Sequence, residues 1–169
     1  TVGHMPRTER PRMADYGVPA ELDGALPWAW AEERLVRCRN YWIVTASAAG
    51  RPHAMPAWGV WLPAAERFWF ACAPSARKLR NLEANPQITI AVDDTVECVS
   101  LEGTARRADV AEAGPAIDAY LPKYWDPEQH QASADFLRSN AIVEVTPRRA
   151  FGIIEREEEF SRAATRWVW

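Results

Sequence analysis

The sequence predicts a mainly β (α+β) fold: an antiparallel β-barrel with helices inserted between its strands and flanking them. Six or more short β-rich segments follow one another, and most are joined by tight turns. The helical segments do not alternate regularly with the strands, which disfavours a doubly wound parallel sheet. At 169 residues the chain is expected to form a single domain. We expect an N-terminal arm over residues 1–27 and one barrel domain over residues 28–169.

The first element of the barrel domain is expected to be a helix. Residues 6–27 are rich in Pro, Arg and Glu without a sustained period, so an extended, mobile arm is expected there. The stretch Thr1–Met5 resembles a tag remnant, and His4 is therefore excluded from functional arguments. Between Pro27 and Cys38, apolar residues recur at helical spacing after a helix-starting proline, which predicts a short amphipathic helix.

The central third of the chain carries three strands and a helix. Strands are expected over 41–47, 52–62 and 67–72, with a tight turn at residues 48–50. Pro52 and Pro56 make the second of these an edge or irregular strand, because proline cannot donate to a ladder. A helix is expected over 76–84 because Leu79 and Leu82 would face inward and Asn85-Pro86 would end it.

The last part of the chain continues the pattern. Strands are expected over 87–93 and 96–106, followed by a helix over 111–121 with Pro115 in its first turns. A loop over 122–131 and a short helix over 132–138 come next. Two separate strands, 141–145 and 151–154, are expected on either side of Pro147, and a β-like segment over 165–169 ends the chain.

Composition excludes several classes of function. The net charge is −3 with basic and acidic residues interspersed, which disfavours nucleic-acid and membrane-surface partners. The three cysteines form no paired motif, which favours reduced thiols and a cytoplasmic location. The nine tryptophans suit a planar ligand or a subunit interface, although packing is the ordinary role of any single one.

The sequence contains no recognisable catalytic constellation. Gly-rich nucleotide motifs and a nucleophile elbow are missing, and His53 and His130 lack partners at metal-ligand spacing. No metal site and no particular catalytic residue are therefore predicted. Chains of this kind often assign the difficult chemistry to a bound cofactor.

One segment offers a site for an anion. Ser75, Arg77 and Lys78 surround the predicted start of a helix, where free backbone N–H groups and a partial positive charge favour phosphate. Cations at this end oppose the helix dipole, and a neighbouring anion would explain them. The alternative is that Arg77 and Lys78 are simply exposed first-turn residues.

The strand over 52–62 would present two different faces. Alternation places His53, Met55, Ala57 and Gly59 on one face, and Ala54, Pro56 and Trp58 on the other. Gly59 would allow a ring to approach the backbone closely. His53 is expected to be half-exposed near a turn, and Met55 is expected to fill the core.

Three motifs resemble a known family. They are G-x-P-H-x-x-P at residues 50–56, S-x-R-K-x-x-N-L-x-x-N-P at residues 75–86, and the ending T-R-W-x-aromatic at residues 165–169. The first two resemble the flavin and deazaflavin oxidoreductases of the split β-barrel superfamily, which is pyridoxamine-phosphate-oxidase-like. The ending resembles the branch of that superfamily that uses the deazaflavin coenzyme F420.

The resemblance implies an FMN-binding-like split β-barrel that forms a homodimer with cofactor grooves between its subunits. Arg77 and Lys78 would hold the cofactor phosphate, with Ser75 and Asn81 nearby. The terminal Arg166 and Trp167 would reach the pocket, either from the same chain or from the partner chain. The tricyclic ring would be lined by Met55, Pro56, Ala57 and Trp58.

The resemblance also implies an activity: hydride transfer from reduced F420 to a conjugated small-molecule acceptor. Two alternatives remain open. One is an FMN-binding oxidoreductase on the same fold, because the phosphate anchor would serve both cofactors. The other is a flavin or F420 carrier without turnover, which the missing acid–base constellation permits.

Overall fold

The computed structural model describes residues 5–169, so the tag-like residues up to His4 lie outside the described part. The helices and strands in chain order are β1 (Arg7–Glu9), η1 (Ala14–Tyr16), α1 (Trp28–Arg37), β2 (Tyr41–Ala46), β3 (Pro52–Ala57), β4 (Gly59–Leu62), β5 (Arg67–Cys72), α2 (Arg77–Ala84), β6 (Gln87–Ala91), β7 (Glu97–Ala108), α3 (Gly114–Tyr124), η2 (Pro127–Gln129), α4 (His130–Arg138), β8 (Ala141–Ile154), α5 (Phe160–Ala163) and β9 (Thr165–Val168).

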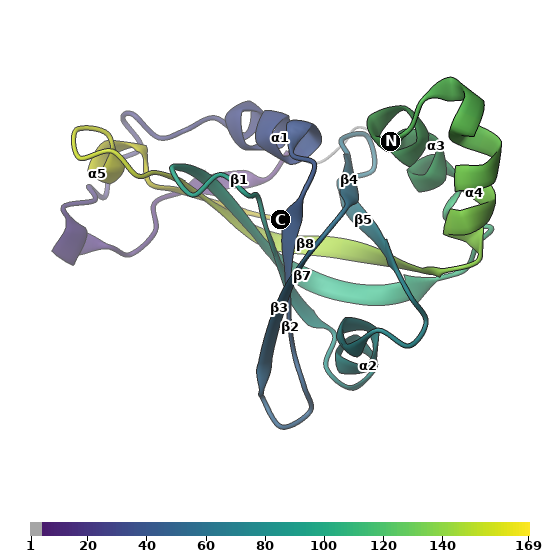
Figure 1. Ribbon diagram of the computed structural model, residues 1–169. Coiled ribbons are helices and arrows are strands. Elements are labelled where there is room, and N and C mark those ends of the chain that lie inside the picture. Colours follow the sequence, from purple (N-terminus) through teal and green to yellow (C-terminus); the bar gives the residue numbers. More distant parts are fainter. Residues whose placement is uncertain (1–4) are drawn as a thin grey trace.

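The strands form one antiparallel sheet that curls into a split barrel (Figure 1). Its main path runs β1-β9-β8-β7-β6-β2-β3, and β5 joins it through β8 while β4 pairs with β5. Along one edge β8 pairs with β7 over almost its whole length. Along the other edge it pairs first with β5 and then with β9. The predicted antiparallel barrel with inserted helices is confirmed.

The prediction of two separate strands around Pro147 is wrong, because β8 runs unbroken through this residue. The register shifts there: Glu102 of β7 faces Arg149, whereas Gly103 faces Pro147, which leaves Arg148 as the extra residue of a bulge. A bulge accommodates a proline because it interrupts the ladder locally. A side chain at Gly103 would collide with the backbone of Thr146, so the close approach of the strands requires glycine.

The N-terminal arm is anchored, contrary to the expectation of a mobile segment. Strand β1 pairs with β9 at the edge of the sheet. The buried guanidinium of Arg10 donates hydrogen bonds of 2.7 Å to four backbone carbonyls, those of Glu21, Asp23, Arg162 and Ala164. These bonds tie the arm to the chain end before β9.

Two further boundaries differ from the sequence-based expectation. The strand expected over 52–62 is divided at Trp58 into β3 and β4, which pair with different partners, β2 and β5. The loop expected over 122–131 is mostly helical, because α3 continues to Tyr124 and α4 already begins at His130. Pro115 does lie in the first turn of α3, as expected.

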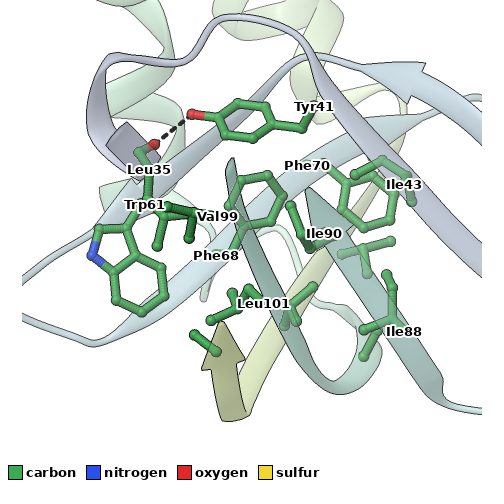
Figure 2. Packing of buried hydrophobic residues seen from close by; sticks show 14 of the residues in the cluster. Leu35, Tyr41, Ile43, Trp61, Phe68, Phe70, Ile88, Ile90, Val99 and Leu101 are labelled. Carbon is green, nitrogen blue, oxygen red and sulfur yellow. Dashed lines mark hydrogen bonds between the residues drawn. The ribbon is translucent and has the colours of Figure 1, made fainter. Parts of the chain in front are cut away.

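The barrel encloses an aromatic and aliphatic core (Figure 2). Phe68 and Phe70 of β5 pack against the inward residues of β2, β6 and β7, including Ile43, Ile90 and Leu101. Tyr41 is fully buried, and its hydroxyl donates a 2.6 Å hydrogen bond to the Leu35 carbonyl at the end of α1. This bond satisfies a polar group that would otherwise be costly in the core.

The helices lie outside the barrel at separate places (Figure 1). Helix α2 packs beside β2 at the hairpin end, and α1 lies against β4. Helices α3 and α4 pack together over β4 and the first half of β8, and they enclose a second apolar cluster with Val60, Trp69 and Ile142. No helix in the described residues is long and apolar enough to cross a membrane.

The arm gives a testable prediction about stability. Arg10→Ala should lower the free energy of unfolding by about 1–3 kcal/mol, because it leaves buried carbonyls without a donor. For a chain of this size each kcal/mol lowers Tm by about 2–4 °C. Calorimetry would measure the change, with Arg12→Ala as the control because Arg12 is exposed. Equal Tm values for the two variants would show that the Arg10 bonds do not hold the arm.

Candidate anion and cofactor site

Helix α2 begins without a side-chain cap. Its N-cap residue is Ala76, whose own N–H donates to the Ala73 carbonyl at 2.9 Å. The N–H groups of Arg77 and Lys78 fall in the first turn, where a helix supplies no carbonyl acceptor. The side chains of Arg77 and Lys78 add positive charge to the positive end of the helix dipole. This combination favours a bound anion.

A third cation and a histidine share this region. Burial lowers the pKa of His53 on β3, and the positive charges of Arg77 and Lys78 lower it further. Burial raises the pKa of the Cys72 thiol at the end of β5, whereas the charges of Lys78 and Arg107 oppose that shift. Residues from β3, β5, α2 and β7 thus converge, and we refer to Arg77, Lys78 and Arg107 as the cationic cluster.

The charges of the cationic cluster are not compensated within the chain. Over residues 5–169 none of its three members forms an ion pair, whereas the adjacent Arg106 pairs with Glu112 and Glu144. The Nδ1 atom of His53 is buried and has no hydrogen-bond partner in the described structure. Buried polar atoms without a partner are uncommon, and a bound water or ion is one explanation for them. Every group gathered here can donate a hydrogen bond, which fits a phosphate.

Asn81 has a different position from the one expected. It is buried, and its side-chain amide donates a 3.0 Å hydrogen bond to the Thr45 hydroxyl on β2. With Leu79 and Leu82 on the same buried side, this bond fixes α2 on the barrel. Asn81 therefore helps to fix the helix that carries Arg77 and Lys78. Ser75 lies exposed in the turn before the helix, next to the cluster in sequence.

The four residues predicted to line a ring have unequal surroundings. Met55 is 49% exposed, so the expectation that it fills the core is wrong. It is paired with the buried Ile43, but β3 is an edge strand that does not pair with β5. Pro56 lies on the outer face and Ala57 is half-buried. Trp58 is 45% exposed and stacks on Tyr124, with ring centroids 4.6 Å apart and planes 9° apart.

Gly59 accommodates a ring of the protein itself. A side chain at Gly59 would collide with the ring of Phe68, which packs directly on the glycine backbone. The sequence correctly indicated a ring close to Gly59, but the ring belongs to the core.

A family model described as pyridoxamine 5'-phosphate oxidase matches residues 30–153. The chain belongs to this family. The match covers the barrel strands β2 to β7, most of β8, α2 with the cationic cluster, and the α3–α4 region.

Solved structures of this fold confirm the architecture. A conserved hypothetical protein from Mycobacterium tuberculosis superposes with a TM-score of 0.68 at 18% identity, covering 82% of this chain and 91% of its own. A haem storage protein from Vibrio cholerae gives 0.54 at 21% identity, covering 71% and 86%. An F420 reductase gives 0.51 at 22% identity, covering 70% and 94%. No curated protein matches the sequence significantly.

The terminal residues of this pyridoxamine 5'-phosphate oxidase family member do not have the surroundings expected from the resemblance. Trp167 is completely buried in the core, packed edge-on against Trp28, so its ring has no surface for a cofactor. The expected contact of Trp167 is therefore wrong. The guanidinium of Arg166 is paired with Glu9 of the N-terminal arm, and its Nε donates to that carboxylate at 2.9 Å. Arg166 lies on β9, whereas the cationic cluster lies at the α2 end of the barrel.

Arg107 escaped the sequence analysis for a physical reason. It is part of a strand that was expected to end at residue 106, and no local pattern relates it to residues 77 and 78. Only the pairing of β7 with β8, and of β8 with β5, brings it near Cys72. Its signal in the sequence is the pair Arg106-Arg107, whose members point to opposite faces of the strand.

The electrostatics of the site can be checked without any ligand. The charge of Lys78 lowers the pKa of His53, so Lys78→Ala should raise that pKa. NMR titration of the His53 ring protons would measure the shift. The control is Arg80→Ala, an exposed cation of the same helix that does not act on His53. An unchanged His53 pKa in Lys78→Ala would show that the Lys78 charge does not act on His53. The two residues would then not belong to one site.

Proposed function

We propose that the protein is an oxidoreductase that binds coenzyme F420 and transfers a hydride from its reduced deazaflavin to a conjugated small-molecule acceptor. The observation that carries the proposal is the cationic cluster at the uncapped start of α2, beside the orphaned Nδ1 of His53. Arg77, Lys78 and Arg107 would hold the phosphate of the cofactor. Reduced F420 supplies the hydride, and the residues of the chain bind and orient it.

Strand β3 is the proposed position for the ring system. It is an edge strand, and it leads from His53, near the cationic cluster, to Trp58. The exposed Met55 offers an adaptable apolar contact along this edge. We keep Met55, Ala57 and Trp58 as proposed ring contacts. Pro56 points to the opposite face and would contact a cofactor only by its backbone.

The choice between F420 and FMN does not come from the phosphate site, which suits both cofactors. It rests on the terminal Thr165-Arg166-Trp167 motif and is supported by the F420 reductase of the same fold. Within the single chain Trp167 is buried and Arg166 is paired with Glu9, so the motif supports F420 only through the family resemblance. An FMN-dependent oxidoreductase therefore remains the alternative, as does a carrier without turnover.

The deciding experiment is a binding titration of Lys78→Ala. Removing one charge-assisted contact worth roughly 1.5–3 kcal/mol should weaken F420 binding by about ten- to a hundredfold. Salt should also affect binding less in the variant, because one screened attraction is lost. Fluorescence titration of wild type and variant with F420, FMN and haemin would identify the cofactor, haemin being included because one solved relative stores haem.

Arg80→Ala serves as the matched control for this titration. It removes an exposed cation that lies two positions further along the same helix. Equal affinity of wild type and Lys78→Ala for all three ligands would refute the cofactor site. Tight binding of reduced F420 without oxidation by any conjugated acceptor would support the carrier alternative.

We further propose that the chain forms a homodimer through the outer face of β2, β3 and β6. Trp42 is 43% exposed on this face, between Pro56 of β3 and Ala91 of β6. Val44 continues the face between Ala54 and Thr89, so the surface contains no charged residue along these two rows. Flat apolar surfaces with aromatic anchors are typical of subunit interfaces.

The dimer prediction is tested by Trp42→Glu. A charge in the centre of an apolar interface should convert the dimer to a monomer at micromolar concentration, because the carboxylate would be desolvated without a partner. Light scattering would report the mass. Leu22→Glu, at an exposed apolar residue of the arm, is the control. A wild-type protein that scatters as a monomer would contradict the proposal.

A further inference from the structure

An aromatic groove lies beyond the end of β3, between the β3–β4 corner and the helices that follow β7. The groove is widely open to solvent, has a volume of about 610 Å³ and is lined mainly by apolar atoms. The lining residues are Trp58, Trp125, Glu128, Gln129, Ala132, Ser133 and Phe136. This size falls within the range of small-molecule sites in proteins.

The floor of the groove is held rigidly. One face of the Trp58 ring is stacked on Tyr124, and Trp125 packs against it edge-on with centroids 5.5 Å apart. The Tyr120 hydroxyl donates a 2.8 Å hydrogen bond to the Trp58 carbonyl, which fixes the backbone. The partly exposed indole is therefore a fixed aromatic platform, with Tyr124 behind it.

The corner beneath this platform is fixed by a second set of bonds. The Gly59 N–H donates to the Tyr124 hydroxyl at 3.0 Å, and that hydroxyl donates to the Arg39 carbonyl at 2.7 Å. The ammonium of Lys123 donates to the Gly59 carbonyl at 2.9 Å. Such bonds reduce the entropy lost when a ligand stacks on Trp58, because the ring is already in place.

The helical side of the groove, opposite Trp58, favours ligands of a particular shape and charge. Phe136 of α4 is 60% exposed and lines the groove. Among residues 5–169 no Lys or Arg lines the groove, and Glu128 is the single ionisable residue of the lining. An anionic ligand is therefore disfavoured. Offset stacking on an indole favours a flat molecule over a puckered one of equal size.

We propose that this groove binds an uncharged, flat aromatic or conjugated molecule, and that it is the acceptor site of the proposed oxidoreductase. The assignment of the ligand as hydride acceptor rests on the proposed function, because the groove begins at Trp58 where the proposed ring-binding strand ends. The binding preference itself rests only on the groove. A flat, uncharged acceptor would stack on Trp58 and contact Phe136 with its other side.

The experiment measures binding of simple probes to the cofactor-free, full-length protein. Calorimetric titrations at neutral pH would compare 2-naphthol, which is flat and uncharged, with decahydro-2-naphthol, which is puckered, and with 2-naphthoate, which is anionic. We expect 2-naphthol to bind the wild type most tightly. Trp58→Ala should weaken its binding by about tenfold, and Phe136→Ala by severalfold.

The control variant is Tyr16→Ala, which removes an aromatic residue that is 66% exposed and lies outside the groove. Wild-type affinity for 2-naphthol should be retained in this variant. Equal affinities in Trp58→Ala, Phe136→Ala and Tyr16→Ala would overturn the proposal, as would equal binding of the flat and puckered probes. A change of oligomeric state in Phe136→Ala would assign the groove to a second copy of the chain instead.

The outcome does not depend on the phosphate contact of Lys78. Lys78→Ala should bind 2-naphthol like the wild type even where it loses F420, because Lys78 does not line the groove. If Lys78→Ala keeps full affinity for F420, the cofactor proposal fails while the groove proposal is still decided by the naphthol series. If the naphthol series fails and F420 binding responds to Lys78→Ala, only the acceptor site is refuted.

Discussion

The structure depends on the backbone pairing of β8. This strand contributes one edge to β7 over almost its whole length and divides the other edge between β5 and β9. The division is possible because the bulge at Arg148 turns the strand between its two partners. Its pairing with β5 fixes the side of the barrel that carries Cys72. Its pairing with β9 fixes the strand on which β1 of the N-terminal arm is anchored.

The cationic cluster on this scaffold is electrostatically unfavourable within the chain itself. Arg77 and Lys78 repel each other and the helix dipole, and the charge extends to Arg107 on another element. The conflict is maintained because Leu79, Leu82 and the Asn81–Thr45 hydrogen bond fix α2 on the barrel regardless of the charges. Sites where local preference is overruled in this way are often sites of function. An anion bound at the start of α2 would relieve the conflict.

The sequence predicted those features that depend on local patterns. The helix start near Arg77 was found because it combines a turn, basic residues and a proline-terminated helix within a dozen positions. The anchoring of the arm could not be predicted in this way, because Arg10 makes hydrogen bonds with residues up to 154 positions away in the sequence. For the same reason Arg107 and the burial of Trp167 were missed, since both follow from strand pairing. The continuity of β8 was missed because Pro147 is tolerated only by a bulge that involves Gly103 on another strand.

The two proposed sites are connected by β3. Its first half carries His53 beside the cationic cluster, and Trp58 follows directly after its last residue. Five residues of extended chain span roughly 16 Å. A ligand with an anionic end and a flat end, lying along this edge, would therefore meet positive charge at one end and an aromatic platform at the other. Because β3 is an edge strand that does not pair with β5, its side chains along this path remain open to a ligand, as the exposure of Met55 shows. The split in the barrel is thus what allows one short strand to serve both sites.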